Sequence, residues 1–221
     1  MNRSDAVRHA LRTTRSVRRR IDFERPVEPE VLEDCIDTAV QAPTGGQREG
    51  WRFLIVTDPA KKAGLAELYR RALQSYRERL AEQARADGEE PRALRPSQQA
   101  LADRLQDMPA LILVCIEGRP ADSTAQQVAF YGSILPAAWS LMVALRARGL
   151  GSTWTTLHLL HEEEAARLLG IPDDVTQTVL IPVGYTKGAV LRPAKRSPAR
   201  EVTFWNHWGE KAPIDDPTRT S

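Results

Sequence analysis

Hydrophobic positions recur at helical spacing in several parts of the chain, and each such stretch has its own boundary signals. The first, residues 4–13, is a short amphipathic segment for which Ser4 is a candidate N-cap. A second helix is predicted to begin at Pro29 and to end before Pro43, because proline suits the first turn of a helix and interrupts later turns. Its buried stripe consists of Val31, Leu32, Cys35, Ile36, Ala39 and Val40.

The middle of the chain predicts one long helix followed by an excursion. The helix is expected to start at Asp58-Pro59 and carries apolar side chains at helical spacing as far as Leu80. Residues 84–99 contain one glycine and two prolines among charged side chains, so this stretch is expected to be a solvated loop or mobile excursion. A shorter helix is predicted over His161–Leu169.

One long stretch has no charge: from Ser123 the chain carries no charged residue before Arg146. It predicts a helix over 125–148, kinked at Pro136. Its length is sufficient for a membrane span. Polar residues and the proline interrupt it, however, and the rest of the chain is polar. We therefore expect a central core or dimer helix, and no membrane partner.

Three β-rich runs predict buried strands: Trp51–Thr57, Ala110–Ile116 and Thr176–Gly184. Together with the helices, and without an internal repeat or a dividing linker, they predict one α+β domain over residues 1–221. A sandwich is favoured over a regular array of βαβ units. The aromatic segment Val202–Trp208 is expected to dock on a surface.

Composition agrees with a soluble globular protein, since 42% of the 221 residues are hydrophobic and 27% are charged. The net charge of +2 does not by itself imply a polyanionic partner. Cys35 and Cys115 lie in apolar surroundings, which is typical of buried thiols in a reducing cytosol. The arginine-rich start has no apolar signal region, so we expect a cytoplasmic protein.

Candidate chemistry begins with Arg15-Ser16-Val17-Arg18, within a start of the chain that holds eight arginines in residues 1–25. Guanidinium groups match phosphate oxygens bidentately, and a serine hydroxyl adds a donor. A solvated basic face or a nucleic-acid patch would have the same composition. No interleaved aromatic residues and no reading helix accompany the run, so nucleic acid is disfavoured. A second basic segment spans Lys187–Arg200.

Two uncharged turns lie between the basic segments. Pro43–Gln47 contains two glycines, which allow the backbone to approach a flat ring, although a plain turn from helix to strand is an equal alternative. Gly149–Thr156 lacks the third glycine of a dinucleotide fingerprint, and the chain contains no P-loop. Two cationic segments and two donor-rich turns suit one phosphorylated, ring-bearing ligand.

A metal site is the remaining candidate. His158 and His161 precede three glutamates, but acidic residues also occupy the first turn of many helices. Zinc needs three or four converging ligands, and the two cysteines are remote from these histidines in sequence. We therefore expect no metal. The chain also shows no hydrolytic constellation of side chains.

Taken in order, these segments resemble the nitroreductase family of FMN-dependent flavoproteins. Arg15–Arg18 resembles the opening phosphate motif of the family, and the segment from Ala42 to Phe53 resembles its A-P-S/T-x-x-N-x-Q-P/G-W-x-F signature. Gly149–Leu157 resembles its G-L-G-S-x-W segment. Ile181–Tyr185, followed by Lys195–Pro198, resembles its closing strand and late basic residues.

The resemblance covers about residues 11–205 and implies a fold. That fold is an α/β/α sandwich with a mixed, mainly antiparallel central sheet flanked by helices. The protein would be a domain-swapped homodimer whose tail, residues 200–221, wraps the partner. One FMN would bind per subunit at the dimer interface.

The resemblance also implies roles for particular residues. Arg15, Ser16 and Arg18 would hold the FMN phosphate, together with Lys195 or Arg196. The Pro43–Gly45 turn of the partner would flank the flavin ring, and Thr155–Leu157 would line its other side with a backbone N–H near N5. The full set of expected cofactor-binding residues is Arg15, Ser16, Val17, Arg18, Pro43, Thr44, Gly45, Gln47, Thr155, Thr156, Leu157, Lys195 and Arg196.

The implied activity is a ping-pong reaction in which NAD(P)H reduces FMN and an electron-poor acceptor, such as a nitroaromatic or a quinone, is reduced in turn. The flavin carries the difficult chemistry, so no residue is assigned as catalytic. Gln47 and Glu49 depart from the usual asparagine and glutamine of the family. Alternatives are another flavin-dependent task (dehalogenation, enone reduction or flavin destruction) or a nucleic-acid binder without enzymatic activity.

Overall fold

A computed structural model describes residues 2–47, 49–91 and 93–212. Its centre is a sheet of four strands in the order β1-β2-β4-β3. The neighbouring strands all pair antiparallel, and parallel pairing occurs in isolated bridges such as Ser16–Ser152. The predicted α+β class with a mixed, mainly antiparallel sheet is confirmed. The strands are β1 (Trp51–Val56), β2 (Ala110–Glu117), β3 (Leu150–Ser152) and β4 (Val175–Tyr185).

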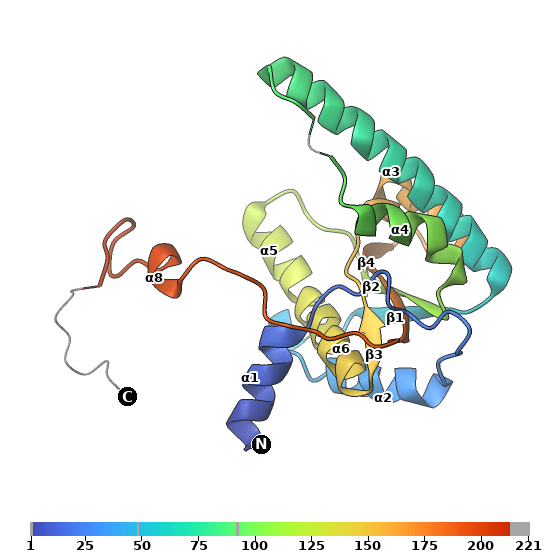
Figure 1. Ribbon diagram of the computed structural model, residues 1–221, viewed down its shortest axis with the longest axis horizontal. Helices are drawn as coiled ribbons and strands as arrows, with labels where there is room; N and C mark the ends of the chain where they lie inside the picture. Colours follow the sequence, from blue (N-terminus) through green and yellow to red (C-terminus); the bar gives the residue numbers. More distant parts are fainter. Residues whose placement is uncertain (1, 48, 92, 213–221) are drawn as a thin grey trace.

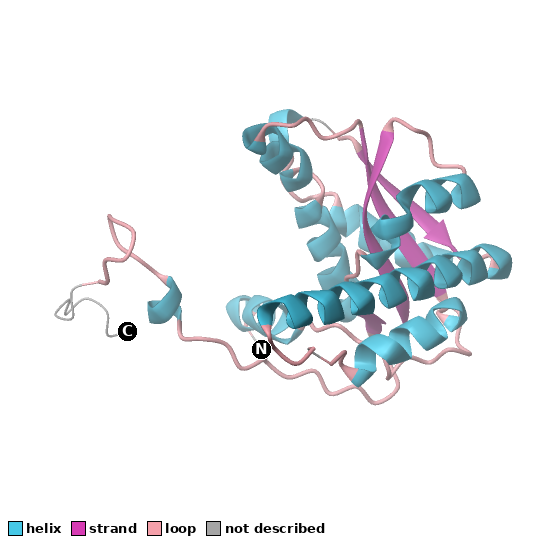
Figure 2. Ribbon diagram, turned by 90° about the horizontal axis from the view of Figure 1, so that it is seen from above, coloured by secondary structure: helices cyan, strands magenta, loops and turns pink. Residues whose placement is uncertain are grey.

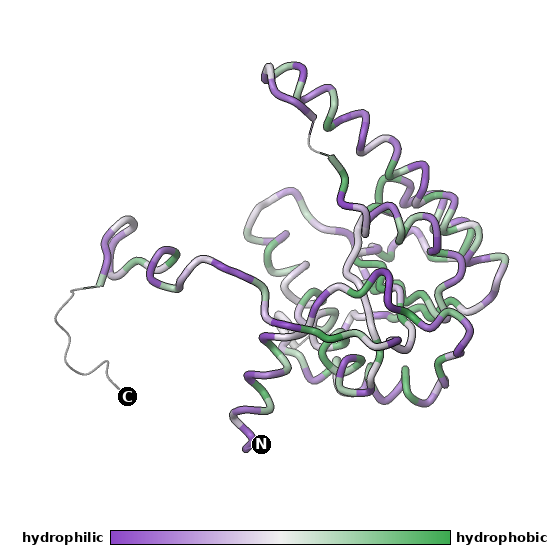
Figure 3. The backbone as a smooth tube through the Cα atoms, in the orientation of Figure 1, coloured by the Kyte–Doolittle hydropathy of each residue, from purple (hydrophilic) through white to green (hydrophobic). Residues whose placement is uncertain are grey.

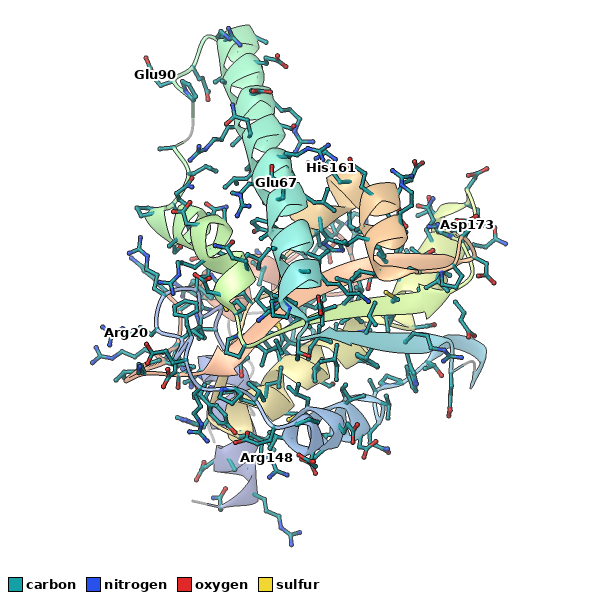
Figure 4. All side chains as sticks on the ribbon, turned by 90° about the vertical axis from the view of Figure 1, so that its right-hand side faces the viewer. Arg20, Glu67, Glu90, Arg148, His161 and Asp173 are labelled. Atoms are coloured by element: carbon teal, nitrogen blue, oxygen red, sulfur yellow. The ribbon has the colours of Figure 1, made fainter. Side chains whose placement is uncertain are left out.

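Helices cover both faces of the sheet (Figures 2 and 4). Leu111, Leu113 and Cys115 of β2 face one hydrophobic cluster, whereas Ile112 and the other alternate residues face a second cluster. A strand buried on both faces reads as a continuous apolar run, which is why β2 was recognisable in the sequence. The first face is covered by α3 (Pro59–Asp87), α4 (Pro96–Arg104) and α7 (Glu162–Leu169), and the second by α2 (Pro29–Ala39) and α6 (Leu135–Ala147).

The prediction of a loop over residues 84–99 is wrong at both ends. Helix α3 continues to Asp87 and ends at Gly88, whose φ of 68° forms a left-handed C-cap. Helix α4 begins at Pro96, so only residues 88–95 connect the two helices. The outer half of α3 projects from the body of the protein and is largely hydrophilic (Figures 1 and 3). Good helix formers such as alanine, glutamate and arginine continue the helix there, although few of its residues are buried.

The uncharged stretch forms two helices, α5 (Thr124–Gly132) and α6, instead of one kinked helix. The break falls at Ser133 and Ile134, and Pro136 lies in the first turn of α6, where a missing N–H costs nothing. By length and composition alone, Thr124–Ala147 could cross a membrane, but 39% of its apolar window is buried. Leu141 and Leu145 of α6 are fully buried against the sheet. The described α6 is thus a core helix.

The two ends of the described chain lie outside the sandwich. Helix α1 (Arg3–Thr13) is capped by Asn2 and not by Ser4, because the Asn2 side chain accepts a hydrogen bond of 2.8 Å from the Asp5 N–H. The chain beyond β4 leads away from the body to a short helix, α8 (Ala199–Val202) (Figure 1). The predicted docking of Val202–Trp208 is not seen on its own sandwich, and Trp208 is 84% exposed. Residues 213–221 of the tail lie outside the described residues.

Three short 3-10 helices complete the described secondary structure. They are η1 (Gly45–Gln47), η2 (Leu105–Asp107) and η3 (Leu157–His161). Both cysteines are free and buried, but they lie on opposite faces of the sheet. Burial raises the pKa of the Cys115 thiol to about 12, so this thiol is unreactive at neutral pH.

Candidate functional site

The arginine segment, defined as Arg15–Arg20, lies along the short strand β3. The Val17 N–H donates to the Ser152 oxygen at 2.9 Å, and the Thr153 hydroxyl donates to the Val17 oxygen at 2.8 Å. Ser16 and Ser152 form a parallel bridge. The predicted phosphate motif and the predicted Gly149–Thr156 segment, more than a hundred residues apart in sequence, are therefore hydrogen-bonded neighbours.

Gly151 makes this close approach possible. A Cβ atom at this position would lie 2.9 Å from the Val17 Cβ, 2.9 Å from the Ile21 Cδ1 and 2.8 Å from the Thr186 Cγ2. Such distances are well inside ordinary van der Waals contact. The second glycine of the Gly-Leu-Gly sequence thus serves packing of the arginine segment on the sheet.

Tyr69 of α3 interacts with both the arginine segment and the Gly149–Thr156 segment. Its hydroxyl and that of Thr155 are 3.0 Å apart, and the phenol is only 3% exposed. Burial raises the pKa of Tyr69, and the positive charge of Arg18 acts against that rise. Arg18, Tyr69 and Thr155 therefore belong to one electrostatic and hydrogen-bonded group.

The three residues predicted to line a flavin ring on this side have different environments. The backbone N–H and oxygen of Thr155 both pair with Leu180, at 3.1 and 2.9 Å, and its hydroxyl pairs with Tyr69, so each polar group of Thr155 already has a partner within the protein. Thr156 is exposed, and neither its N–H nor its hydroxyl has a hydrogen-bond partner in the described part of the chain. Leu157 is half-buried against the core. Thr156 is the residue with free donors.

A cavity of about 430 Å³ lies beside the arginine segment. Arg20 holds its outer wall in place, because the Arg20 Nη1 donates to the Gly188 oxygen at 2.9 Å and the Lys187 N–H donates to the Arg20 oxygen at 2.9 Å. Arg20 is labelled at the edge of the molecule in Figure 4. The lining residues are Ser16, Val17, Arg18, Arg19, Arg20, Ser97, Ala189, Val190, Leu191 and Arg192.

The late basic residues lie differently from the early ones. Arg192 lines the cavity, whereas Lys195 and Arg196 are exposed on the chain that leads away from it. Their predicted contact with a phosphate stays a prediction. The structure adds Arg192 as a late basic residue that lines the cavity together with the arginine segment.

Arg15 and Arg18 carry unbalanced charge. Both are half-buried, and no carboxylate of the described residues forms an ion pair with either. The pKa of Arg18 is lowered mainly by burial and additionally by the positive charge of Arg95, while Tyr69 acts in the opposite direction. A partly desolvated cation without a counter-ion is unfavourable until an anion arrives. The charge distribution thus favours an anionic ligand.

The Pro43–Gln47 turn lies elsewhere in the single chain. The Gly45 N–H donates to the Ser133 hydroxyl at 2.9 Å, which fixes the turn at the end of α5. A Cβ at Gly45 would lie 3.0 Å from that hydroxyl oxygen, so a larger residue here would crowd this contact. Pro43 and Gly45 are exposed and Thr44 is half-buried, while the Gln47 side chain lies outside the described residues. Pro43, Thr44 and Gly45 are not among the described residues that line the cavity beside Arg18.

The two histidines considered as metal ligands are separated by their environments. His158 is fully buried, neither of its ring nitrogens has a hydrogen-bond partner among the described residues, and burial lowers its pKa to about 4. His161 Nδ1 instead lies 3.0 Å from Glu164, which also pairs with Arg71. In the described ranges, no three His, Cys, Asp or Glu side chains gather as a metal site would need.

Sequence reasoning missed four residues near this site. Tyr69 lies within the helix predicted from Asp58-Pro59 to Leu80 but was not singled out, although a buried tyrosine usually needs a partner for its hydroxyl. Arg95 and Ser97 fell in the stretch read as a loop, and Arg192 was not distinguished from its basic neighbours. Tyr69 alone carried a signal that the sequence could have offered.

The fold and this anion-favouring site define a class of cofactor-binding α+β proteins, and comparison with known sequences specifies the class. A sequence profile of the Nitroreductase family matches residues 11–185. The chain belongs to the nitroreductase family. The family consists of flavoproteins, its members act on small molecules and are typically dimers, and the relatives support an enzymatic role.

Individual relatives have more than one activity. The chain is 33% identical to iodotyrosine deiodinase of Drosophila melanogaster, over 83% of this chain and 63% of that protein. It thus spans less than two-thirds of the length of that relative. It is 29% identical to an NADH dehydrogenase of Thermus thermophilus, over 91% of this chain and 96% of the other.

Solved structures agree on the fold. Oxidized iodotyrosine deiodinase bound to FMN and 3-iodo-L-tyrosine superposes with a TM-score of 0.65 at 25% identity, covering 91% of this chain and 98% of the other. Nitroreductase A from Vibrio parahaemolyticus gives a TM-score of 0.70 at 17% identity, covering 96% and 79%. The second likeness concerns the fold alone.

Proposed function

We propose that this chain is an FMN-dependent oxidoreductase that uses NAD(P)H to reduce an electron-poor organic acceptor. The observation that carries the proposal is Arg18. It is a half-buried cation without a carboxylate partner among the described residues, beside a cavity, and connected through Tyr69 to Thr155. Family membership turns this anion site into a proposed site for the phosphate of a flavin.

The residues present fit FMN. Arg15 and Arg18 supply uncompensated positive charge, and Ser16 is exposed at the cavity wall. Arg192 lines the same cavity, with Lys195 and Arg196 further along the chain. Charge-assisted hydrogen bonds from arginine to a phosphate are among the strongest that proteins make. Riboflavin lacks the phosphate and would lose this contribution.

On the ring side, Thr156 would orient the cofactor. Its N–H and hydroxyl are free among the described contacts, whereas Thr155 is used by Leu180 and Tyr69 and serves as a support. Bound FMN would supply the redox chemistry, accepting a hydride from NAD(P)H and passing electrons to the acceptor. The protein contributes binding, orientation and exclusion of water.

A second copy of the chain would complete the site. Helix α5 has no buried residue, and Val128 on it is 68% exposed. Trp139 of α6 is 39% exposed and Trp208 of the tail 84% exposed. Large apolar side chains exposed on neighbouring elements are typical of protein interfaces. We propose that a partner covers them and places its own Pro43–Gly45 turn against the flavin.

The first test of the proposed function is whether the protein binds flavin, which is visible as a yellow colour. The purified protein is expected to be yellow, or to become so when FMN is added, and to oxidise NADH or NADPH with a nitroaromatic or a quinone. Both pyridine nucleotides should be compared against each acceptor at steady state. A colourless protein that takes up no FMN in an equilibrium titration would remove the proposal.

Dehalogenation is the second candidate, because iodotyrosine deiodinases are among the relatives. The two activities separate in one experiment. Release of iodide from 3-iodo-L-tyrosine by the dithionite-reduced protein would favour a deiodinase, particularly if NADH and NADPH are both inert. Rapid reduction of nitroaromatics by NAD(P)H without iodide release would favour the oxidoreductase.

A further inference from the structure

A second cavity, of about 210 Å³, opens on the other side of Arg18. It lies where the outer half of α3 and the loop returning from it meet the start of α4. No residue of the cavity was part of the predicted cofactor site except Arg18. The lining residues are Arg18, Tyr76, Leu80, Ala93, Leu94, Arg95 and Gln98.

The charge of this cavity has one sign. Among the described lining residues, the charged ones at neutral pH are Arg18 and Arg95, and neither arginine forms an ion pair with a described carboxylate. The two cations are close enough for Arg95 to act on Arg18 electrostatically. An anion placed between two such cations relieves their repulsion and replaces the water that Arg18 has lost.

The backbone of Arg95 is held in place by two hydrogen bonds to Gln98. Its N–H donates to the Gln98 side-chain oxygen at 3.0 Å, and its own oxygen accepts from the Gln98 N–H at 2.8 Å. These bonds set Arg95 at the N-cap of α4. The positive end of the α4 dipole adds to the potential of the two guanidinium groups. The exposed Arg95 side chain is thus anchored at its base but can adjust to a ligand.

Apart from the polar Gln98, the rest of the described lining is apolar or aromatic. Tyr76 and Leu80 lie one turn apart on α3 and are half-buried, and Leu94 is half-buried across from them. Such a surface suits a flat organic body, while the arginines suit a carboxylate.

We propose that this cavity binds the carboxylate of an aromatic acid, and that Arg95 makes the enzyme select anionic acceptors over neutral ones. The proposal rests on the proposed function, because Arg18 lines both cavities and thereby connects this one to the proposed FMN site. It assigns Arg95 as a determinant of substrate specificity.

The experiment compares two pairs of ligands on the FMN-loaded protein. Benzoate and benzamide, which cannot be reduced, are titrated by the change they cause in flavin absorbance. Para-nitrobenzoate and para-nitrobenzamide are then compared as acceptors. Benzoate is expected to bind about tenfold or more tightly than benzamide, and Arg95→Gln should remove most of this preference, since one good charged contact is worth at least that factor.

Arg85→Gln is the matched control. Arg85 is exposed on the same outer half of α3 and its Nε donates to the Ala81 oxygen, so the substitution removes an equal charge from the same region without touching the cavity lining. The control should keep the preference for benzoate. Equal losses in Arg85→Gln and Arg95→Gln would overturn the proposal, because a general field and not a site would then attract the anion.

The affinity for FMN separates this proposal from the proposed function. Arg95→Gln should leave FMN binding unchanged, and a loss of FMN affinity without a change in the benzoate preference would place the phosphate here instead. If the protein takes up no FMN, the proposed function fails. Benzoate should still raise the melting temperature of the apoprotein in an Arg95-dependent manner, and a lack of any effect would refute the cavity proposal as well.

Discussion

Removing the Arg18 guanidinium tests the phosphate site most directly. Arg18 is half-buried and has no carboxylate partner in the described structure, so its favourable interactions are proposed to form only when FMN is bound. A charge-assisted hydrogen bond contributes about 1.5–3 kcal/mol. Arg18→Ala should therefore weaken FMN binding roughly 10- to 150-fold.

Two comparisons test whether the expected loss of FMN affinity comes from the phosphate contact. Riboflavin has the same ring without the phosphate, so its affinity should change far less than that of FMN. The apoprotein should melt no lower than wild type, because the substitution removes an unpaired cation that Arg95 repels. Arg12→Ala is the control: Arg12 is exposed on the last turn of α1 and lines neither cavity.

Fluorescence titration of the apoprotein with FMN and with riboflavin measures both affinities. Equal losses for the two ligands would refute the assignment of Arg18 to the phosphate. A large drop in the melting temperature of the Arg18→Ala apoprotein would show that the side chain supports the fold, and the site would then have to be built from other residues.

Three further predictions concern packing, pH and assembly. Gly151→Ala should destabilise the protein by roughly 1–3 kcal/mol in urea and weaken FMN, because the new methyl displaces Val17 and the arginine segment. Stability should fall as the pH decreases from 6.5 to 4, by up to roughly 3 kcal/mol, because burial depresses the His158 pKa and only the unfolded chain binds a proton in that range. His158→Leu should flatten this dependence. Sedimentation at micromolar concentration should show a dimer that loses its flavin on dissociation.

Each of these predictions can fail in its own way. Unchanged FMN binding in a stable Gly151→Ala protein would separate the packing of β3 from the cofactor site. An unaltered pH profile in His158→Leu would assign the acid sensitivity to carboxylates such as Glu164, whose pKa is held at about 2 by Arg71. A monomer that retains FMN tightly would refute a site shared between two copies.

The sandwich could be predicted from the sequence because its strands and main helices have strong periodic or apolar patterns. β2 is a continuous apolar run, β4 is buried on both faces with an apolar centre, and α2 is marked by Pro29 at its start. One error, the N-cap of the first helix, arose because two neighbouring residues compete for the same role. Asn2 and Ser4 are both good N-caps, and only the geometry of the chain selects Asn2.

The site could be predicted only in part, for a related reason. The motif around Arg18 and the segment around Thr155 were found, and the structure brings them together. The second cavity was missed because Arg95 was assigned to a loop. Helix propensity alone does not show that α3 and α4 form a hairpin that returns Arg95 to Arg18. Such contacts depend on tertiary structure.

The outer wall of the first cavity is irregular chain. It is tied down at Lys187 and Gly188 through Arg20, and beyond Gly188, whose φ is 60°, residues 189–192 pair with no strand. Leu191 packs against the core, but no backbone hydrogen bond among the described contacts holds residues 189–192 to the sheet, so we expect this wall to be the part of the cavity that opens when a flavin enters or leaves. The residence time of the cofactor would then depend on how firmly the far end of the tail is held. A partner subunit that binds the tail would restrict the opening of this wall. The rate of flavin exchange would then follow the rate of subunit exchange.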